Sequence, residues 1–390
     1  MGIVVQKFGG TSVGSVERIE NVAKLISAER ESGNQVVVIV SAMAGVTDGL
    51  VKFAQNIIGS SCDFNSREYD VVLSSGEIAS AGLLALALEK LGIKCRSFQA
   101  WQIKINTDAK FNDARITDID AGKLIKCIDS GVVPIVCGFQ GVCENSITTL
   151  GRGGSDTTSV AIAAALGAKV CDIYTDVDGI YSIDPNKFLG ARRIEITTYD
   201  EVINMAYSGA KVLHPRAAEL GKRYGVEIRV RSSFNINSKG TVIKNYEVRM
   251  ERSIVTAVTA KRNQALVSLL SAEDFTVVLK SLSAVNYNIE NSSMKEEGSK
   301  LLISLSGDDV SALEHSLGKS VANIERGLAK ITVTGFGIKH NNQIVEKVFQ
   351  IVQNRGIKIL QSAITDISIS LYVADEEGEL AQDLHDALIG

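Results

Sequence analysis

The residues best suited to chemistry form a glycine-rich segment near the start of the chain. Residues 7–12, KFGGTS, follow an apolar run at 3–5 and precede a helical pattern in which apolar residues recur from Val16 to Ile26. Paired glycines let a backbone approach an anion, and a helix start offers free N–H groups and a positive dipole end. Lys7 adds a full positive charge. The segment therefore fits a phosphate-binding loop, although a tight turn with a surface lysine would fit it equally well.

Four further segments combine small hydroxyl residues, glycines and single charges. They are SAMAGVTD at 41–48, LSSGE at 73–77, GRGGSDTT at 151–158 and TDVDGIY at 175–181. In a sheet of parallel strands, the loops at the carboxyl ends of the strands converge, and ligands bind there. One such loop is usually a solvated turn, but five that converge indicate a ligand site.

The elements that would position these loops alternate from residue 1 to about 240. Strands are predicted at 3–5, 36–40, 132–136, 170–174 and 226–230, and helices at 77–91 and 156–166. Continuous β-branched runs such as 36–40 are typical of strands buried on both faces. The alternation predicts an α/β domain with a mostly parallel sheet between helix layers.

Beyond residue 240 the sequence predicts an internal repeat of βαββα units. The first copy covers 264–271, 273–285, 287–291, 300–306 and 310–317, and the second covers 329–334, 341–354, 357–361, 367–373 and 376–388. A strand at 321–326 can end the first copy, and a strand at 253–259 can complete the second, so that the two copies interleave. A single sheet of this kind leaves one face uncovered, which favours pairing of the copies or of chains.

Composition excludes several classes of function. The 390 residues carry a formal net charge of −4, which argues against a general nucleic-acid surface. No uninterrupted apolar run reaches ~18 residues and no signal peptide is seen at the start, so we expect neither membrane insertion nor export. The six cysteines form no CxxC pair and the four histidines are scattered, so zinc binding and a histidine-based triad are not supported. These features suggest a reducing cytoplasm.

The loop residues fit phosphoryl transfer to an amino acid. Such a reaction needs cations and N–H donors around the phosphates. Lys7, the glycine pair and Lys211 can supply them. Arg152 can bind a carboxylate bidentately, and Glu77 suits an ammonium group. A site that binds both a carboxylate and an ammonium group fits an amino acid as the phosphoryl acceptor.

Six motifs, in this order along the chain, resemble the aspartate kinases (aspartokinases) of the amino acid kinase superfamily. They are KFGGTSV (7–13), SAM (41–43), SGE (75–77), GRGGSD (151–156), TDVDG (175–179) and RVRSS (229–233). The resemblance implies an amino acid kinase domain at 1–245, followed by two interleaved βαββαβ ACT domains of the α+β class at 246–330 and 331–390, with strand 253–259 contributed to the second. It implies ATP- and Mg²⁺-dependent phosphorylation of the side-chain carboxylate of L-aspartate to 4-phospho-L-aspartate, the first step toward diaminopimelate, lysine, threonine and methionine.

The resemblance also implies roles for individual residues. Lys7 and Asp156 would be catalytic, with Asp156 orienting the lysine. Contacts to the substrate would come from Thr47, Glu77, Arg152, Gly153, Gly154 and Ser155. Contacts to the nucleotide would come from Lys7, Phe8, Gly9, Gly10, Ser41, Thr175, Asp176, Tyr181, Lys211 and Val212. No residue is assigned as a metal ligand.

Structural interpretations compete with these roles. Glu77 could be a charge that complements a helix dipole, Asp156 a helix N-cap, and Tyr181 a core aromatic residue. Two other functions also stay open: another kinase of the superfamily, such as glutamate 5-kinase or uridylate kinase, and a non-catalytic amino acid sensor.

Departures from the family pattern lie mainly outside the kinase core. Lys187 stands one residue beyond the place where the family often has Arg after Asp-Pro, residues 271–275 lack the usual Pro-Gly turn, and 340–343 lack a common glycine. The resemblance implies a homo-oligomer, dimer or tetramer, formed through the ACT domains, and a lysine or threonine effector. The altered loops predict weak or absent inhibition.

Overall fold

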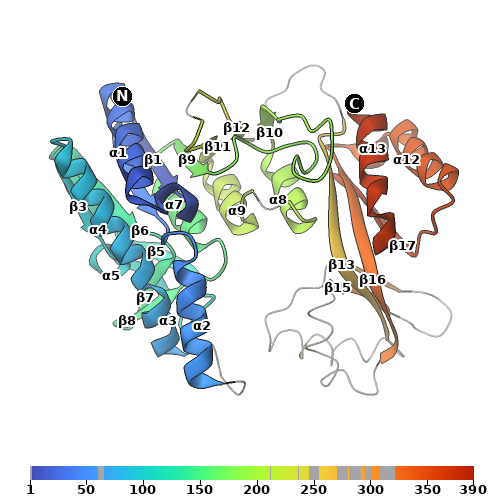
Figure 1. Ribbon diagram of the computed structural model, residues 1–390, viewed down its shortest axis with the longest axis horizontal. Helices are drawn as coiled ribbons and strands as arrows, with labels where there is room; N and C mark the ends of the chain where they lie inside the picture. Colours follow the sequence, from blue (N-terminus) through green and yellow to red (C-terminus); the bar gives the residue numbers. More distant parts are fainter. Residues whose placement is uncertain are drawn as a thin grey trace. The chain divides into compact units, whose positions relative to one another are not determined.

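A computed structural model of the chain describes residues 2–59, 66–210, 212–235, 237–245, 254–269, 280, 291–294, 301–306 and 321–390. The chain divides into two compact units, whose elements are labelled in Figure 1. Unit 1 comprises Met1–Ile180, Arg193–Ile203 and Lys211–Val248, and unit 2 comprises Tyr181–Arg192, Asn204–Ala210 and Arg249–Gly390. The chain therefore passes from unit 1 into unit 2 three times, and it returns to unit 1 after each of the first two passages.

Unit 1 is built on a sheet with the strand order β10-β12-β11-β9-β1-β2-β6-β3. The strands are β1 (Ile3–Phe8), β2 (Gln35–Val40), β3 (Cys95–Phe98), β6 (Val133–Cys137), β9 (Val170–Thr175), β10 (Ile196–Thr197), β11 (Glu227–Ser232) and β12 (Thr241–Ile243). All neighbouring pairs are parallel except β11 and β12. The predicted mostly parallel sheet is confirmed.

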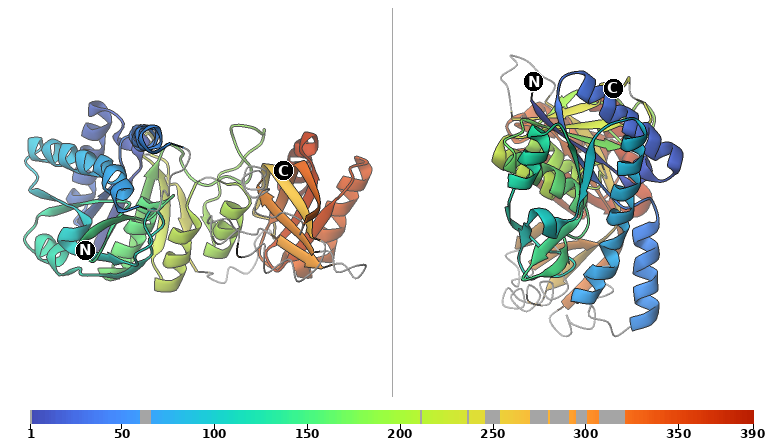
Figure 2. Two further views of the ribbon diagram at one scale, coloured as in Figure 1. Left: turned by 90° about the horizontal axis from the view of Figure 1, so that it is seen from below. Right: turned by 90° about the vertical axis from the view of Figure 1, so that its left-hand side faces the viewer.

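Helices pack on both faces of this sheet, as the views in Figure 2 help to follow. On one face, α1 (Val16–Glu31) and α4 (Ser75–Lys90) share a core with the alternate residues Val36, Val38 and Val40 of β2. Helix α7 (Gly154–Ala165) contacts β1, β9 and β2, and α9 (Pro215–Tyr224) packs on α7. Val16, where the predicted helical pattern begins, is 73% exposed because it is the first residue of α1, whereas Ile19, Val22 and Ile26 are buried.

Several shorter elements of unit 1 were not predicted. A second sheet has the order β5-β4-β7-β8. Its strands are β4 (Ile105–Thr107), β5 (Ile116–Ile119), β7 (Gln140–Cys143) and β8 (Ser146–Thr149). The additional helices are α2 (Val46–Ile58), α3 (Arg67–Leu73), α5 (Ala100–Ile103), α6 (Gly122–Asp129) and α8 (Tyr199–Tyr207).

The helical stretch Arg67–Lys90 is long and apolar enough to cross a membrane by length and composition alone. It contains α3 and α4, and the α4 side chains of Leu84 and Leu88 are fully buried in the core described above. Core helices of globular proteins share this composition, so the stretch is explained by its packing.

The described residues of unit 2 form a sheet with the order β14-β15-β13-β16-β18-β17. The strands are β13 (Ala257–Leu269), β14 (Asn291–Met294), β15 (Leu301–Ser306), β16 (Val321–Thr334), β17 (Gln361–Thr365) and β18 (Ser368–Ala374). The first part of β13, 257–261, pairs with 330–334, whereas its second part, 264–269, pairs with 321–328. Each of these two long strands therefore serves both repeats. The predicted strands at 321–326 and 329–334 are both present, but they are joined in one continuous strand, β16, and are not separate.

The second repeat carries α12 (Asn342–Asn354) and α13 (Leu380–Leu388), which pack with Ile331, Val333 and Leu371. The predicted helix 376–388 begins only at Leu380, after a 3-10 turn at Asp375–Glu379. The predicted strand 357–361 was also misplaced, because the observed strand β17 begins at Gln361. Ile357 and Ile359, just before it, pack against this core without forming a strand. The predicted helices 273–285 and 310–317 lie outside the described residues.

Candidate active site

Lys7 and Asp156 form an enclosed ion pair. Lys7 lies near the end of β1, in register with Ile39 of β2 and Ile173 of β9. Asp156 lies in the first turn of α7. Lys7 Nζ is 2.6 Å from Asp156 Oδ1, and the two side chains are only 11% and 13% exposed. Asp156 is not the N-cap of α7, a position that Gly153 occupies. The carboxylate can therefore hold the ammonium group in one place beside the sheet.

The glycine-rich loop connects the ends of β1, β2 and β9. Gly9 N donates to Tyr174 O at 3.1 Å, and Ala44 N donates to Gly10 O at 3.1 Å. A Cβ at Gly10 would lie 2.7 Å from Ala42 O, so this position requires glycine for close packing. Phe8 is fully buried and stacks on Tyr174, with ring centroids 4.8 Å apart. Any contribution of Phe8 to ligand binding must therefore come from its backbone.

A 3-10 helix follows the loop in place of the expected start of an α-helix. It spans Gly10–Val13, whereas α1 begins only at Val16, with Ser15 as its N-cap. The positive N-terminal end of the α1 dipole therefore lies at Ser15 and Val16, not at Gly9 and Gly10. That part of the phosphate-loop prediction was wrong.

Glu77 is a buried carboxylate with one unused oxygen. Its side chain is 3% exposed, and Oε1 accepts a hydrogen bond from Ala42 N at 3.0 Å. Oε2 is buried and has no hydrogen-bond partner among the described residues. Burial raises the pKa of Glu77 to about 7. A buried oxygen without a hydrogen-bond partner costs folding free energy, and a ligand cation that binds Oε2 would remove this cost. Glu77 does lie in the first turn of α4, as the helix-dipole interpretation requires, but it is buried and not a solvated charge.

Arg152 lies in the loop between β8 and α7, and its side chain is exposed. It makes no ion pair with another residue in the described part of the chain. The neighbouring glycines bring other elements close. A Cβ at Gly153 would lie 2.2 Å from His214 Cγ, and one at Gly154 would lie 2.8 Å from Phe139 Cδ2. Ser155 lies close to Gly138, just after β6: a Cβ at Gly138 would lie 2.6 Å from Ser155 Oγ.

Of the other predicted site residues, Ser41 follows β2, and Thr175 and Asp176 lie at the end of β9. Ser41 N donates to Phe8 O at 3.1 Å, and Thr175 Oγ1 donates to Asp176 Oδ1 at 3.0 Å. Thr47 is half-buried in the first turn of α2, and Val212 is half-buried. Tyr181 belongs to unit 2, and Lys211 lies outside the described residues.

Comparison with known proteins identifies the family. Residues 2–232 match the model of the amino acid kinase family. The aspartokinase of Geobacillus stearothermophilus is 42% identical, and the alignment covers 99% of this chain and 97% of that protein. Aspartokinase 2 of Bacillus subtilis is 40% identical, with coverage of 99% and 98%. The chain belongs to the aspartokinases.

Solved aspartokinase structures share the fold over the whole chain. Escherichia coli aspartokinase III in complex with aspartate and ADP, in the R-state, has a TM-score of 0.85 and 25% identity, and the match covers 100% of both chains. The same enzyme in complex with lysine and aspartate, in the T-state, has a TM-score of 0.78.

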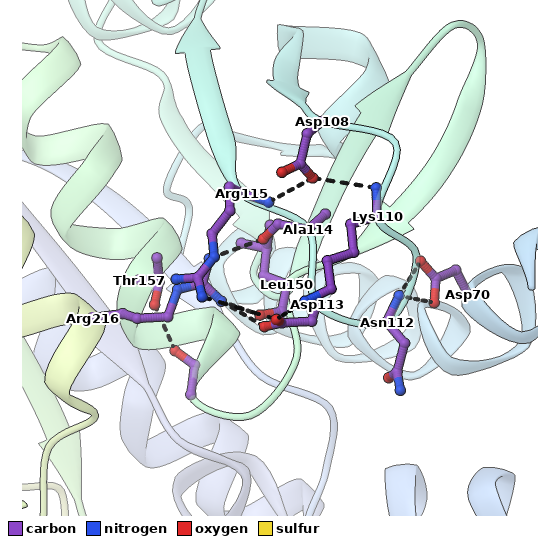
Figure 3. Close-up of polar contacts among 11 residues, drawn as sticks. Asp70, Asp108, Lys110, Asn112, Asp113, Ala114, Arg115, Leu150, Thr157 and Arg216 are labelled. Atoms are coloured by element: carbon purple, nitrogen blue, oxygen red, sulfur yellow. Dashed lines mark hydrogen bonds and ion pairs between the residues drawn. The ribbon is translucent and has the colours of Figure 1, made fainter. Parts of the chain in front are cut away.

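Sequence reasoning missed several residues that support this aspartokinase site. Asp70 is fully buried and accepts hydrogen bonds from Asn112 N, Thr149 N and Thr149 Oγ1. Arg216 donates to Leu150 O and Ala114 O (Figure 3). The sequence gives no distinct signal for Asp70, because its helix α3, REYDVVL, contains other charged residues. The sequence gives no signal for Arg216 either, because its two closest acceptors, Leu150 O and Ala114 O, are backbone carbonyls.

The RVRSS motif connects two loops of the site. Ser233 N donates to Thr175 O at 3.0 Å, and the hydroxyls of Ser233 and Ser12 lie 2.7 Å apart. Arg229 and Arg231 flank the fully buried Asp172 at 3.8 and 3.4 Å. The motif therefore fastens β11 to β9 and to the segment that follows the glycine pair.

Proposed function

We infer that this chain transfers the γ-phosphoryl group of ATP to the side-chain carboxylate of L-aspartate. The product is 4-phospho-L-aspartate, the first intermediate toward lysine and diaminopimelate, threonine and methionine. The observation that carries this conclusion is the unpartnered, buried Oε2 of Glu77, at the same end of the sheet as the Lys7–Asp156 pair. The full-length similarity to aspartokinases, one of them solved with aspartate and ADP, supports it.

The chemistry requires charge neutralisation and no general base. An aspartate side chain has a reference pKa near 3.9 and is already ionised at neutral pH. The difficulty is to bring this anion to the phosphates, and Lys7 and backbone N–H groups reduce the repulsion. Asp156 orients Lys7 for this task. Glu77 Oε2 accepts the substrate ammonium, and Arg152 binds the α-carboxylate. Thr47 and 153–155 complete the substrate side of the site.

We assign the nucleotide to the loops after β1 and β9. The backbone of 8–10 and Ser41 would face the phosphates, with Thr175, Asp176, Tyr181, Lys211 and Val212 as further contacts. Magnesium ions in such sites are held mainly by phosphates and waters, with one or two carboxylates. Asp156 would supply such a carboxylate on the protein side. When bound, Mg²⁺ neutralises phosphate charge.

We further propose a cytoplasmic homo-oligomer, a dimer or a tetramer, held together through the ACT repeats, with lysine or threonine as effector. Support comes from the continuous sheet shared by the two repeats and from the relative solved with lysine. The loop 271–275, on which the expectation of weak inhibition rests, lies outside the described residues.

A coupled ADP-release assay with aspartate, glutamate and UMP as acceptors tests the function. Of the three acceptors, we expect only aspartate to support turnover. Turnover with glutamate or UMP would assign the chain to another kinase of the superfamily, and the absence of turnover with all three would favour a non-catalytic sensor.

A further inference from the structure

The loop that carries Arg152 is fastened on both sides. Before it, Thr149 is bound through its N–H and hydroxyl to the buried carboxylate of Asp70, at 2.6 and 2.8 Å. Leu150 O accepts from Arg216 Nη1 at 2.5 Å. After it, Gly153 lies against the ring of His214, two residues before Arg216. Arg152 itself has no such partner in the described chain, so its position depends on these neighbours.

Arg216 also holds a second segment against this loop. Its side chain is 12% exposed, and Nη2 donates to Ala114 O at 2.9 Å, while Nη1 lies 3.5 Å from Asp113 Oδ1. Ala114 N donates to Thr149 O at 2.9 Å, which pairs the two segments directly. Figure 3 shows Arg216 at one end of this contact and Asp70, which binds Asn112 N, at the other.

The packing between the two segments leaves little room for the loop to move. Gly151 has φ +71, and a Cβ there would lie 2.9 Å from Asn112 O. A guanidinium presents its donors in a fixed planar fork, so Arg216 defines the direction of both carbonyls at once. A lysine has the charge without this fork and cannot reproduce the geometry.

We propose that Arg216 is a positioning residue for substrate binding: it fixes the Leu150 carbonyl, and thereby the direction from which Arg152 meets the α-carboxylate of aspartate. The inference rests on the proposed function of the Arg152 side chain. Bidentate binding of a carboxylate depends on orientation, so a displaced loop loses affinity for aspartate while the nucleotide loops after β1 and β9 remain unchanged.

The test is steady-state kinetics of the full chain with Arg216→Lys and Arg216→Gln, together with thermal unfolding of each variant. We expect KM for aspartate to rise by roughly 10-fold or more, as for the loss of a charge-assisted hydrogen bond, with KM for ATP nearly unchanged. Arg216→Lys is the milder variant and keeps the test open if Arg216→Gln does not fold. Arg223→Gln is the matched control, because Arg223 lies on the same helix, is exposed and lines the same 470 Å³ cavity. Its aspartate KM should equal that of the unchanged chain.

A double-mutant cycle separates positioning from a general structural role. If Arg216 acts through Arg152, then Arg216→Lys adds no further loss of aspartate affinity in an Arg152→Ala background. Additive effects, an unchanged aspartate KM, or an equal rise in both KM values would overturn the inference while the unchanged chain still phosphorylates aspartate. Absence of aspartate-dependent ADP release from the unchanged chain would instead defeat the proposed function, and the inference with it.

Discussion

At the scale of single residues, the Lys7–Asp156 pair places a fixed positive charge at the end of the central strand. Both residues were predicted from motifs, and the family resemblance implied that Asp156 orients the lysine; the structure shows the two side chains, far apart in the sequence, 2.6 Å apart. Because the pair is enclosed, the lysine ammonium is held by one strong partner and cannot sample many rotamers. Such preorganisation is what stabilises charge that develops on a transferring phosphoryl group.

Lys7→Met should therefore lower kcat much more than it raises KM for aspartate. The loss of one preorganised cationic contact costs on the order of 3 kcal/mol in the transition state, or roughly 10²-fold in rate. Initial-rate kinetics with both substrates measure this. Lys90→Met is the control, because Lys90 forms an exposed ion pair with Glu20 at 2.8 Å and should leave kcat unchanged. A Lys7→Met enzyme with the original kcat would remove Lys7 from the mechanism.

Glu77 predicts a pH dependence of substrate binding. Its pKa is raised to about 7 by burial, so the carboxylate gains its charge as the pH rises from 6 to 8. Because the charged form binds the substrate ammonium, KM for aspartate should fall over this interval. Glu77→Gln should show a higher KM that no longer varies in this way. The same fall in KM in the Gln variant would show that another group is responsible.

The same shift predicts a stability change. A carboxyl group whose folded pKa lies above its unfolded value makes the unfolding free energy decrease as the pH rises from about 4.5 to about 7, and the loss is complete above that range. Glu77→Gln removes this penalty, so it should be more stable than the parent chain at pH 8, by up to roughly 3 kcal/mol. Urea unfolding at pH 5 and pH 8 measures the difference. A Gln variant that is less stable at pH 8 would contradict the assignment.

At the scale of elements, two glycines should respond oppositely to the same substitution. Gly10→Ala places a Cβ 2.7 Å from Ala42 O, so the β1 and β2 loops must separate, and we expect lower stability and a raised KM for ATP. Gly82 lies inside α4 with no atom within 4 Å of an added Cβ. Gly82→Ala should stabilise the protein by about 0.5–1 kcal/mol through helix propensity. Thermal unfolding and ATP titration of both variants test this contrast.

The sequence predicted β2 and β6 of unit 1 because both are short apolar runs rich in β-branched residues, which favour strands. It did not predict β7 and β8, which are four residues long and partly polar. They form a hairpin through Glu144 and Asn145, with φ of 47° and 66°. A two-residue turn of this kind normally contains Asn-Gly or Asp-Gly, so the signal was weak. In the site, motif residues were identified, but residues such as Arg216 that act through backbone carbonyls were not.

At the scale of the whole molecule, the ACT repeats predict how the enzyme assembles and responds. Each repeat completes its sheet with strands of the other, and we expect the pair to associate with a second copy. Sedimentation should give a dimer or a tetramer, and kinase activity titrated with lysine and threonine, singly and together, should show weak or no inhibition. Strong inhibition by sub-millimolar lysine would show that the changed loop 271–275 keeps effector binding, and a monomer would contradict the assembly.

The repeated passage of the chain between the units limits how this protein can be recombined with its relatives. The segments 181–192 and 204–210 belong to unit 2, although each is flanked by unit 1 in the sequence. Ser182 and the buried His385 of α13 are hydrogen-bonded at 2.8 Å, and Asn204 binds Thr334. A chimera spliced at one point near residue 248 would pair these two short segments with a foreign C-terminal half. A functional chimera must exchange all three segments of unit 2 together, because unit 2 is not one continuous stretch of the sequence.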